Sequence, residues 1–149
     1  MTTARHVVCP HCNAVNRVPA ERLTATGAPL AVCGACKAHL FEGKPLEVDP
    51  AGFDRHLKAN DIPVLVDIWA PWCGPCRSMA PNFARAAGVL EPGMRLLKLN
   101  ADEAPEVGAR YGVRGIPALL LFKGGKLAGQ TAGAMGAEQI VGWARQHAA

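Results

Sequence analysis

The stretch VDIWAPWCGPCR, residues 66–77, decides the fold of this chain. It completes a run from Ile62 to Trp69 that is apolar on both alternating faces except at Asp67, which is typical of a central strand covered by helices on both sides. Cys73-Gly74-Pro75-Cys76 then opens a predicted helix that continues to about Leu90. A strand followed by a helix that begins with C-x-x-C is the usual context of a redox-active dithiol.

The position of the two cysteines predicts their roles in thiol exchange. Free N–H groups and the helix dipole at a helix N-terminus favour a thiolate. Cys73, nearest the helix end and beside Trp72, is expected to be the exposed nucleophile, and Cys76, one turn in, the shielded resolving thiol. Their spacing allows a disulfide to close after a mixed-disulfide intermediate. A third metal-binding pair is the competing interpretation, but no further pair of ligands remains to complete such a site.

Periodic patterns on both sides of this stretch predict the rest of the domain. An N-cap and proline at Asp49-Pro50 indicate a helix start, and Lys123-Gly124-Gly125 indicates a hairpin turn. The predicted order is β-α-β-α-β-α-β-β-α, an α/β core with an antiparallel hairpin at one edge. The further strands are predicted at residues 46–48, 94–99, 118–122 and 126–131, and the further helices at 104–111 and around 137–144.

The first 45 residues differ in composition from the rest. The chain has 149 residues, half of them apolar, which is enough for a packed core. The first third nevertheless has few large apolar residues and holds four of the six cysteines. A segment this short normally needs a metal or disulfides to fold. With the boundary placed near Glu42–Pro45, we expect an N-terminal module at residues 1–44 and a second domain at residues 45–149.

Two further C-x-x-C pairs in this module have the spacing of a metal site. Twenty residues separate the pair Cys9 and Cys12 from the pair Cys33 and Cys36, at the edge of the window typical of zinc sites. Each tight turn directs two thiolates at one centre, and two turns complete a tetrahedral sulfur shell with no position left for water. The sequence therefore predicts one structural Zn²⁺. Two disulfides or four unrelated thiols are the alternatives.

Composition also restricts location and partners. The N-terminus has no signal-peptide core and no apolar run can cross a bilayer, so a cytoplasmic, reducing location is expected, with no membrane partner. The net charge of +4 includes no run of basic residues, and nucleic-acid binding is not expected. The cysteine content lies below the roughly 8–10% of a disulfide scaffold.

Residues 66–77, together with Lys98-Leu99-Asn100, Gly115-Ile116-Pro117 and Phe122–Gly125, resemble the thioredoxin family over residues 46–149. The preceding C-x-x-C pairs are similar to those of the zinc-binding, second type of bacterial thioredoxin. The resemblance implies a thioredoxin fold, a central mixed five-stranded sheet flanked by four helices, with a small N-terminal zinc-ribbon module.

The resemblance also implies roles for single residues. Asp67 is the only charge in a buried strand, so its pKa should be raised, and by likeness it manages protons for Cys76. Lys98, in the neighbouring strand, is expected to partner Asp67. The Ile116–Pro117 bond is expected to be cis, exposing the Ile116 backbone to an extended substrate. The substrate platform around Cys73 is expected to include Trp72, Gly74, Pro75, Ile116, Pro117 and Gly133.

These features predict a cytosolic protein-disulfide reductase. Its expected partners are oxidised proteins and a reductase that restores the dithiol, which the resemblance implies is an NADPH-dependent flavoprotein. No bound organic cofactor is expected. The alternative is a zinc- and redox-sensing interaction protein in which the N-terminal module recruits partners and oxidation of its thiolates releases zinc.

Overall fold

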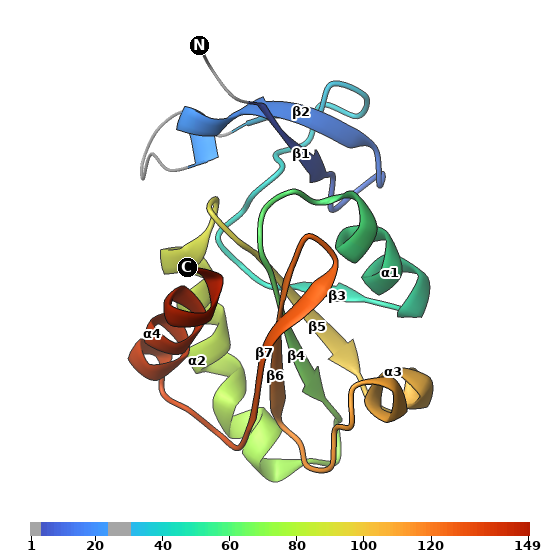
Figure 1. Cartoon of the computed structure of the whole chain (residues 1–149), viewed down its shortest axis with the longest axis vertical. Helices are drawn as coiled ribbons and strands as arrows, with labels where there is room; N and C mark the ends of the chain where they lie inside the picture. The colour runs from blue at the N-terminus through green and yellow to red at the C-terminus, as the bar shows by residue number, and fades with distance from the viewer. Residues whose placement is uncertain (1–3, 24–30) are drawn as a thin grey trace.

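Five strands form one mixed sheet in the order β3-β5-β4-β6-β7 (Figure 1). The computed structural model describes residues 4–23 and 31–149. Strands β3, β5 and β4 run parallel, and β6 and β7 are antiparallel additions beside β4. The strands are β3 (Leu46–Val48), β4 (Val64–Trp69), β5 (Arg95–Asn100), β6 (Ala118–Lys123) and β7 (Lys126–Ala132).

Helices cover both faces of this sheet. Along β4, Val64, Val66 and Ile68 face one core and Leu65 faces the other, as the alternation of a buried strand requires. The first core is closed by α1 (Pro50–Ala59) and α3 (Pro105–Arg110), and the second by α2 (Gly74–Leu90) and α4 (Ala137–Ala148). The predicted α/β fold, with its strand and helix order, is confirmed.

Local signals account for the helix boundaries that position the site. Asp49 caps α1, because its side chain accepts the Gly52 N–H at 2.7 Å. Cys73 caps α2 in the same way, with its sulfur accepting the Cys76 N–H. The helix therefore begins at Gly74, and Cys73 stands at the N-cap position just before it.

The N-terminal module is a small hairpin with its own core. Strands β1 (Ala4–Val8) and β2 (Val15–Pro19) pair antiparallel, and a short 3₁₀ helix, η1 (Ala20–Leu23), follows. Its buried side chains include Val7, Val18, Leu40, Phe41 and, from the loop before β4, Ile62. Of the predicted module 1–44, residues 1–3 and 24–30 lie outside the described residues.

The module lies at the end of the sheet opposite to the start of α2 (Figure 1). Parallel strands β4 and β5 run away from it, so that their carboxyl ends and the first turn of α2 meet at the far edge. The two cysteine sites predicted from the sequence therefore lie at opposite ends of the molecule.

Among the described helices, none is both long and apolar enough to cross a bilayer.

Candidate functional site

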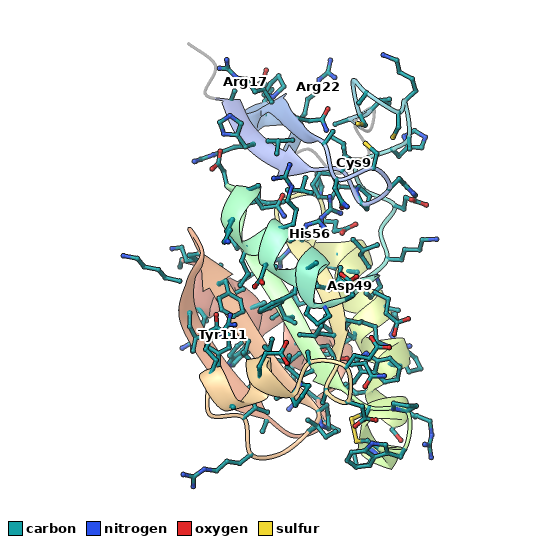
Figure 2. All side chains as sticks on the ribbon, turned by 90° about the vertical axis from the view of Figure 1, so that its right-hand side faces the viewer. Cys9, Arg17, Arg22, Asp49, His56 and Tyr111 are labelled. Carbon is teal, nitrogen blue, oxygen red and sulfur yellow. A yellow bond between two sulfur atoms is a disulfide. The ribbon has the colours of Figure 1, made fainter. Side chains whose placement is uncertain are left out.

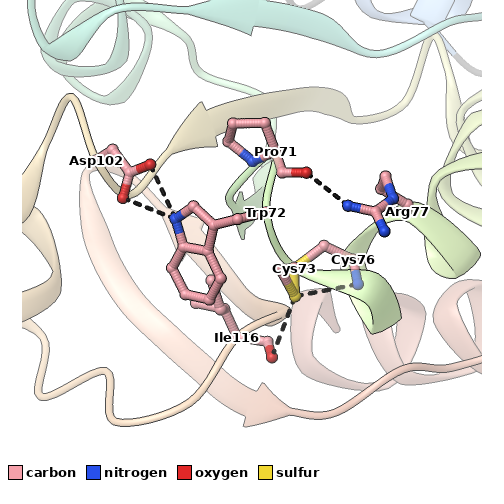
Figure 3. The surroundings of a disulfide bond; sticks show 7 residues. All are labelled: Pro71, Trp72, Cys73, Cys76, Arg77, Asp102 and Ile116. Atoms are coloured by element: carbon pink, nitrogen blue, oxygen red, sulfur yellow. Dashed lines mark hydrogen bonds between the residues drawn. A yellow bond between two sulfur atoms is a disulfide. The ribbon is translucent and has the colours of Figure 1, made fainter.

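The loop between β4 and α2 carries a disulfide between Cys73 and Cys76 (Figure 3). Their Cα atoms are 5.2 Å apart, within the range that a disulfide spans. The Cys76 N–H donates to the Cys73 sulfur at 3.2 Å. In the reduced form this N–H, together with the dipole of α2, stabilises the Cys73 thiolate relative to the protonated thiol.

Both cysteines are buried in this disulfide form. Cys73 is 5% exposed and Cys76 is 2% exposed, so the expectation of an exposed Cys73 is wrong here. The reason is packing, because the Cys73 sulfur is bonded to Cys76 and lies 3.8 Å from the carbonyl oxygen of Ile116. Cys73 still stands before the helix and Cys76 within its first turn, as the motif predicts.

Trp72 is the most exposed large apolar residue of the described chain, at 67%. Its indole Nε1–H donates to both carboxylate oxygens of Asp102, at 3.0 and 3.2 Å (Figure 3). Sequence reasoning missed Asp102. The signal was its place just after β5, because the carboxyl ends of parallel β4 and β5 meet at one edge. On the other side of the loop, Arg77 donates to the Pro71 carbonyl at 2.7 Å.

The loop before β6 packs against the disulfide. The Ile116–Pro117 bond is cis, as the resemblance implies. Pro117 is buried, Ile116 is half-buried, and the Gly133 N–H donates to the Pro117 carbonyl at 2.8 Å. Ile116 and Gly133 are thereby brought to the same edge of the sheet as Cys73, together with half-buried Gly74.

A groove of about 290 Å³ runs beside the disulfide loop, between Trp72 and α3. It is open to solvent, and mostly apolar or small residues line it. It continues past Ile116, whose carbonyl oxygen is close to the Cys73 sulfur. Its lining includes Trp72, Ala101, Ala104, Gly108, Val113 and Ile116.

Asp67 lies in the middle of β4 with its side chain fully buried. Neither carboxylate oxygen has a hydrogen-bond partner within residues 4–23 and 31–149. Burial raises the pKa of Asp67 to about 7, and the charge of Lys98 opposes part of this rise. A carboxyl group with this pKa exchanges its proton near neutral pH.

Lys98 stands opposite Asp67 in the register of β4 and β5. Its ammonium lies 4.6 Å from the centre of the Trp69 ring, in a cation–π contact. The described residues show no ion pair between Lys98 and Asp67, so their interaction is through space and not by direct contact. The two are neighbours on adjacent strands, as the sequence predicts, and the charge of Lys98 acts on Asp67.

The other four cysteines converge at the opposite end of the molecule. The sulfurs of Cys9, Cys12, Cys33 and Cys36 all lie within 4.8 Å of one another. Two of the distances, Cys9 to Cys36 and Cys12 to Cys33, are 3.6 Å. Tetrahedral zinc with four thiolates has sulfur–sulfur distances of about 3.8 Å. The donor set and its spacing therefore fit Zn²⁺.

The two cysteine turns are copies of one backbone motif. In each, the N–H of the residue four positions after the first cysteine, Asn13 or Lys37, donates to that cysteine's carbonyl, at 3.1 and 3.0 Å. Both of these residues have left-handed backbone conformations, with φ of 65° and 68°. The turns direct N–H groups at the sulfurs, as from His11 to Cys9 at 3.3 Å.

Negative charge is stabilised at one of these sulfurs, that of Cys33. Hydrogen bonds from the Cys36 backbone N–H and the Asn16 side chain lower the pKa of the Cys33 thiol. Donors of this kind stabilise thiolates and therefore favour metal binding. At Cys12 the hydrogen bond with the Ala14 backbone lowers the thiol pKa, but burial and hydrogen bonds with the other three thiols outweigh it and raise that pKa. Figure 2 shows Cys9 at one end of the molecule and the yellow disulfide bond at the other, so the metal-type site and the redox pair are separate.

Comparisons of sequence relate both parts of the chain to known proteins. Residues 44–146 match the thioredoxin family model, and residues 8–38 match the model of the zinc-ribbon N-terminal region of thioredoxin 2. Thioredoxin C-3 of Corynebacterium nephridii is 36% identical over 140 residues, covering 94% of this chain and 93% of the relative. Thioredoxin 1 of Nostoc sp. is 44% identical over 89 residues, covering 60% and 83%.

A comparison of structures gives the same result for the larger domain. A mutant thioredoxin of Halobacterium salinarum NRC-1, in which one asparagine is replaced by glutamine, superposes with a TM-score of 0.65 at 28% identity. The match covers 73% of this chain and 95% of that protein. The remaining quarter of the chain is of the size of the N-terminal module.

Proposed function

The chain belongs to the thioredoxin family of thiol-disulfide oxidoreductases, and we propose that it reduces disulfides of other proteins through Cys73 and Cys76. The observation that supports this most strongly is the disulfide at the N-terminus of α2, where a helix dipole and a backbone N–H act on one sulfur. We divide the chain accordingly into a zinc-ribbon module, residues 1–44, and a thioredoxin domain, residues 45–149.

The reaction consists of two thiol–disulfide exchanges. The Cys73 thiolate attacks one sulfur of the substrate disulfide, forms a mixed disulfide and releases the other substrate sulfur as a thiolate. Cys76, deprotonated, then attacks the Cys73 sulfur. The Cys73–Cys76 disulfide forms, and the second substrate thiolate leaves. Two electrons pass from the dithiol to the substrate.

Asp67 is proposed to accept the proton that Cys76 loses in the second step. Its raised pKa supports this role, because a carboxyl group that titrates near pH 7 can both take up and release a proton. Lys98 is proposed to assist by setting that pKa through its charge, since it lowers the pKa of Asp67 without an ion pair. Both groups lie on the face of the sheet that α2 covers, as strand alternation from Leu65 and Leu96 requires.

The substrate is proposed to lie across an apolar platform around Cys73. Exposed Trp72 and the groove beside it offer contact area, and the Ile116–Pro117 loop offers backbone groups for an extended peptide segment. The proposed contacts are Trp72, Gly74, Pro75, Ile116, Pro117 and Gly133.

The oxidised pair must be reduced again after each turnover. We propose that a thioredoxin reductase, an NADPH-dependent flavoprotein, supplies the two electrons. A cytoplasmic location belongs to this proposal, because a cluster of four thiolates needs a compartment that keeps thiols reduced.

One Zn²⁺ is proposed to hold the N-terminal module together. Cys9, Cys12, Cys33 and Cys36 would bind it as thiolates, and such a closed shell supplies folding energy and takes no part in the chemistry. The small core of the module supports this, because a hairpin of this size rarely folds on apolar burial alone.

Two cysteine variants test the reductase. Cys73→Ser should abolish reduction of a model protein disulfide, and Cys76→Ser should accumulate the mixed disulfide, detected by mass spectrometry. Ser78→Ala, an exposed substitution on α2, is the control and should keep full activity. Full activity of Cys73→Ser would contradict the proposed mechanism.

A second function is favoured by the exposure of two of the metal-type cysteines. Cys12 and Cys36 are exposed, whereas Cys9 and Cys33 are buried. An oxidant such as peroxide could convert the four thiolates to two disulfides and release the metal, changing the surface that the module offers to partners. Metal analysis before and after peroxide tests this: metal retention after complete oxidant treatment would exclude a redox-sensing role.

A further inference from the structure

Arg95 is a buried cation at the junction of the two parts of the chain. It stands at the start of β5, and its side chain is 2% exposed. One of its terminal nitrogens, Nη2, donates to the carbonyl of Val8 at 3.0 Å and to that of Leu40 at 2.8 Å. Val8 directly precedes Cys9, and Leu40 follows Cys36 by four residues. A single nitrogen of the thioredoxin domain therefore joins both halves of the zinc-ribbon module.

The partners of Arg95 depend on the module as well. Glu91 lies 3.5 Å from Nη1 with its side chain only 3% exposed, and its other oxygen accepts the Gly43 N–H at 3.0 Å. The Phe41 ring packs against the guanidinium, 4.4 Å from its centre. Buried charges that lose their partners are strongly destabilising. The buried pair of Arg95 and Glu91 is therefore stabilised by contacts with Leu40, Phe41 and Gly43 of the module.

The peptide groups of Val8 are held from both sides. The Val8 N–H donates to Asn60 Oδ1 at 2.8 Å, and the Val8 carbonyl accepts from Arg95. Asn60 is itself buried and is held by His56, whose Nδ1 accepts from Asn60 Nδ2 at 2.7 Å. Figure 2 shows His56 next to the module that carries Cys9. The residue before the first cysteine is therefore fixed by two buried side chains of the thioredoxin domain.

We propose that Arg95 and Asn60 are positioning residues for the metal: they hold the Cys9 turn and the segment after Cys36 in the binding geometry, and so raise the affinity of the module for zinc. The inference rests on the proposed zinc site and goes beyond it. Removal of the outer-shell groups that orient metal ligands typically weakens metal affinity by about 10–100-fold. Linkage requires the reverse effect too, so that metal binding strengthens the contact between the two parts.

The test compares zinc affinity among full-length variants. Zinc is titrated against a competing chromogenic chelator, and its release into excess chelator is timed. Arg95→Met combined with Glu91→Gln removes both buried charges, and about 10–100-fold weaker binding and faster release are expected. Arg95→Lys keeps the charge but lacks the planar guanidinium, and its zinc affinity should lie between that of the parent chain and that of the double variant. Arg85→Met, an exposed arginine of α2, is the matched control and should bind zinc like the parent chain.

Asn60→Leu tests the same residue, Val8, from its N–H side and leaves Arg95 and Glu91 unchanged. It should also weaken zinc binding. If the double variant does not fold, Asn60→Leu alone tests whether the contacts of Val8 set the zinc affinity. Thermal unfolding with and without chelator separates positioning from general stability. Chelator should lower the melting temperature of the parent chain by more than that of the double variant, whereas a purely structural role would give equal shifts.

The outcomes distinguish the two proposals. No zinc binding by the parent chain would overturn the proposed zinc site itself. Tight binding by the parent chain, together with unchanged affinity in folded Arg95 and Asn60 variants, would overturn the positioning role and leave the zinc site intact.

Discussion

Asp67 and Lys98 occupy the same register position on neighbouring parallel strands, yet the lysine packs over Trp69 instead of forming an ion pair. Each Asp67 oxygen lacks a hydrogen-bond partner in the described part of the chain. Burial raises the pKa of this carboxyl group to about 7, and the charge of neighbouring Lys98, which makes no ion pair with it among the described residues, offsets only part of that rise. The protein keeps an unfavourable group in its core at the position where a proton acceptor is proposed.

Asp67→Asn should stabilise the protein at alkaline pH. Because the pKa of Asp67 is higher in the folded than in the unfolded chain, the folded state binds more protons between about pH 4 and pH 7, and stability falls as pH rises through this window. The free energy of unfolding of Asp67→Asn, relative to the parent, should grow by about 2–3 kcal/mol from pH 5 to pH 8. Denaturant unfolding of the oxidised forms measures this, and a difference independent of pH would contradict it.

Removal of the Asp102 carboxylate should weaken substrate binding without preventing the chemistry. The carboxylate fixes Trp72 beside the groove through two hydrogen bonds, and an exposed bond of this kind contributes about 0.5–1.5 kcal/mol. Asp102→Ala should therefore raise KM for a protein disulfide about three- to tenfold. Turnover of a small aromatic disulfide should change little.

Steady-state kinetics with both substrates test this prediction. Glu103→Ala removes the exposed neighbouring carboxylate, which makes no bond to Trp72, and is the control. An equal loss with the protein and the small disulfide would show that Asp102 acts on the reacting sulfurs instead of on substrate contact.

Acid should weaken the contact between the module and the thioredoxin domain. Burial, followed by the charges of Arg95 and Arg55, lowers the pKa of His56 to about 3. Since this value lies below that of the unfolded chain, the unfolded state binds more protons below about pH 6.5 and stability falls with falling pH. Protonation at Nδ1 would also end the hydrogen bond from Asn60.

His56→Gln removes this titration and keeps an acceptor for Asn60. From pH 7 to pH 5 the parent should lose about 2 kcal/mol relative to the variant. Asp67 changes the free energy of unfolding with pH in the opposite direction, but equally in both proteins. The difference in free energy of unfolding between parent and variant at each pH therefore reports His56 alone. Parallel stability curves for the two proteins would refute the prediction.

Gly133 should resist substitution because of its backbone alone. Its φ is +106°, and an added Cβ would meet nothing within 4 Å, so the cost of alanine is conformational. Gly133→Ala should lower the free energy of unfolding by about 1–3 kcal/mol. Gly142→Ala, in the exposed part of α4 with equally open space, should raise it by about 0.5–1 kcal/mol. Equal effects of the two substitutions on stability would contradict this account.

The larger fold and both cysteine sites could be predicted from local sequence. The apolar run ending at Trp69 indicates a buried central strand, and C-x-x-C after it indicates a dithiol at a helix start. Cys9, Cys12, Cys33 and Cys36 are recognisable because two residues between thiolates suit one tight turn around a metal. Each of these signals lies within a few consecutive residues, where covalent geometry limits the possible arrangements.

Only the tertiary structure decided how these parts act on one another. Asp102 lies 30 residues from the indole that it holds, and Arg95 lies 87 residues from Val8. An arginine at the start of a strand is usually exposed, and nothing in its sequence neighbours indicates that it is buried beneath a second module. The lack of an ion pair between Asp67 and Lys98 among the described residues likewise follows from side-chain packing, since the strand register places Lys98 beside Asp67 while its ammonium packs on the Trp69 ring. The sequence by itself determined how the six cysteines divide into a helix-start dithiol and two metal-type pairs, because local spacing is a covalent property. Folding decided which buried charges have partners, because that depends on residues brought together from distant parts of the chain.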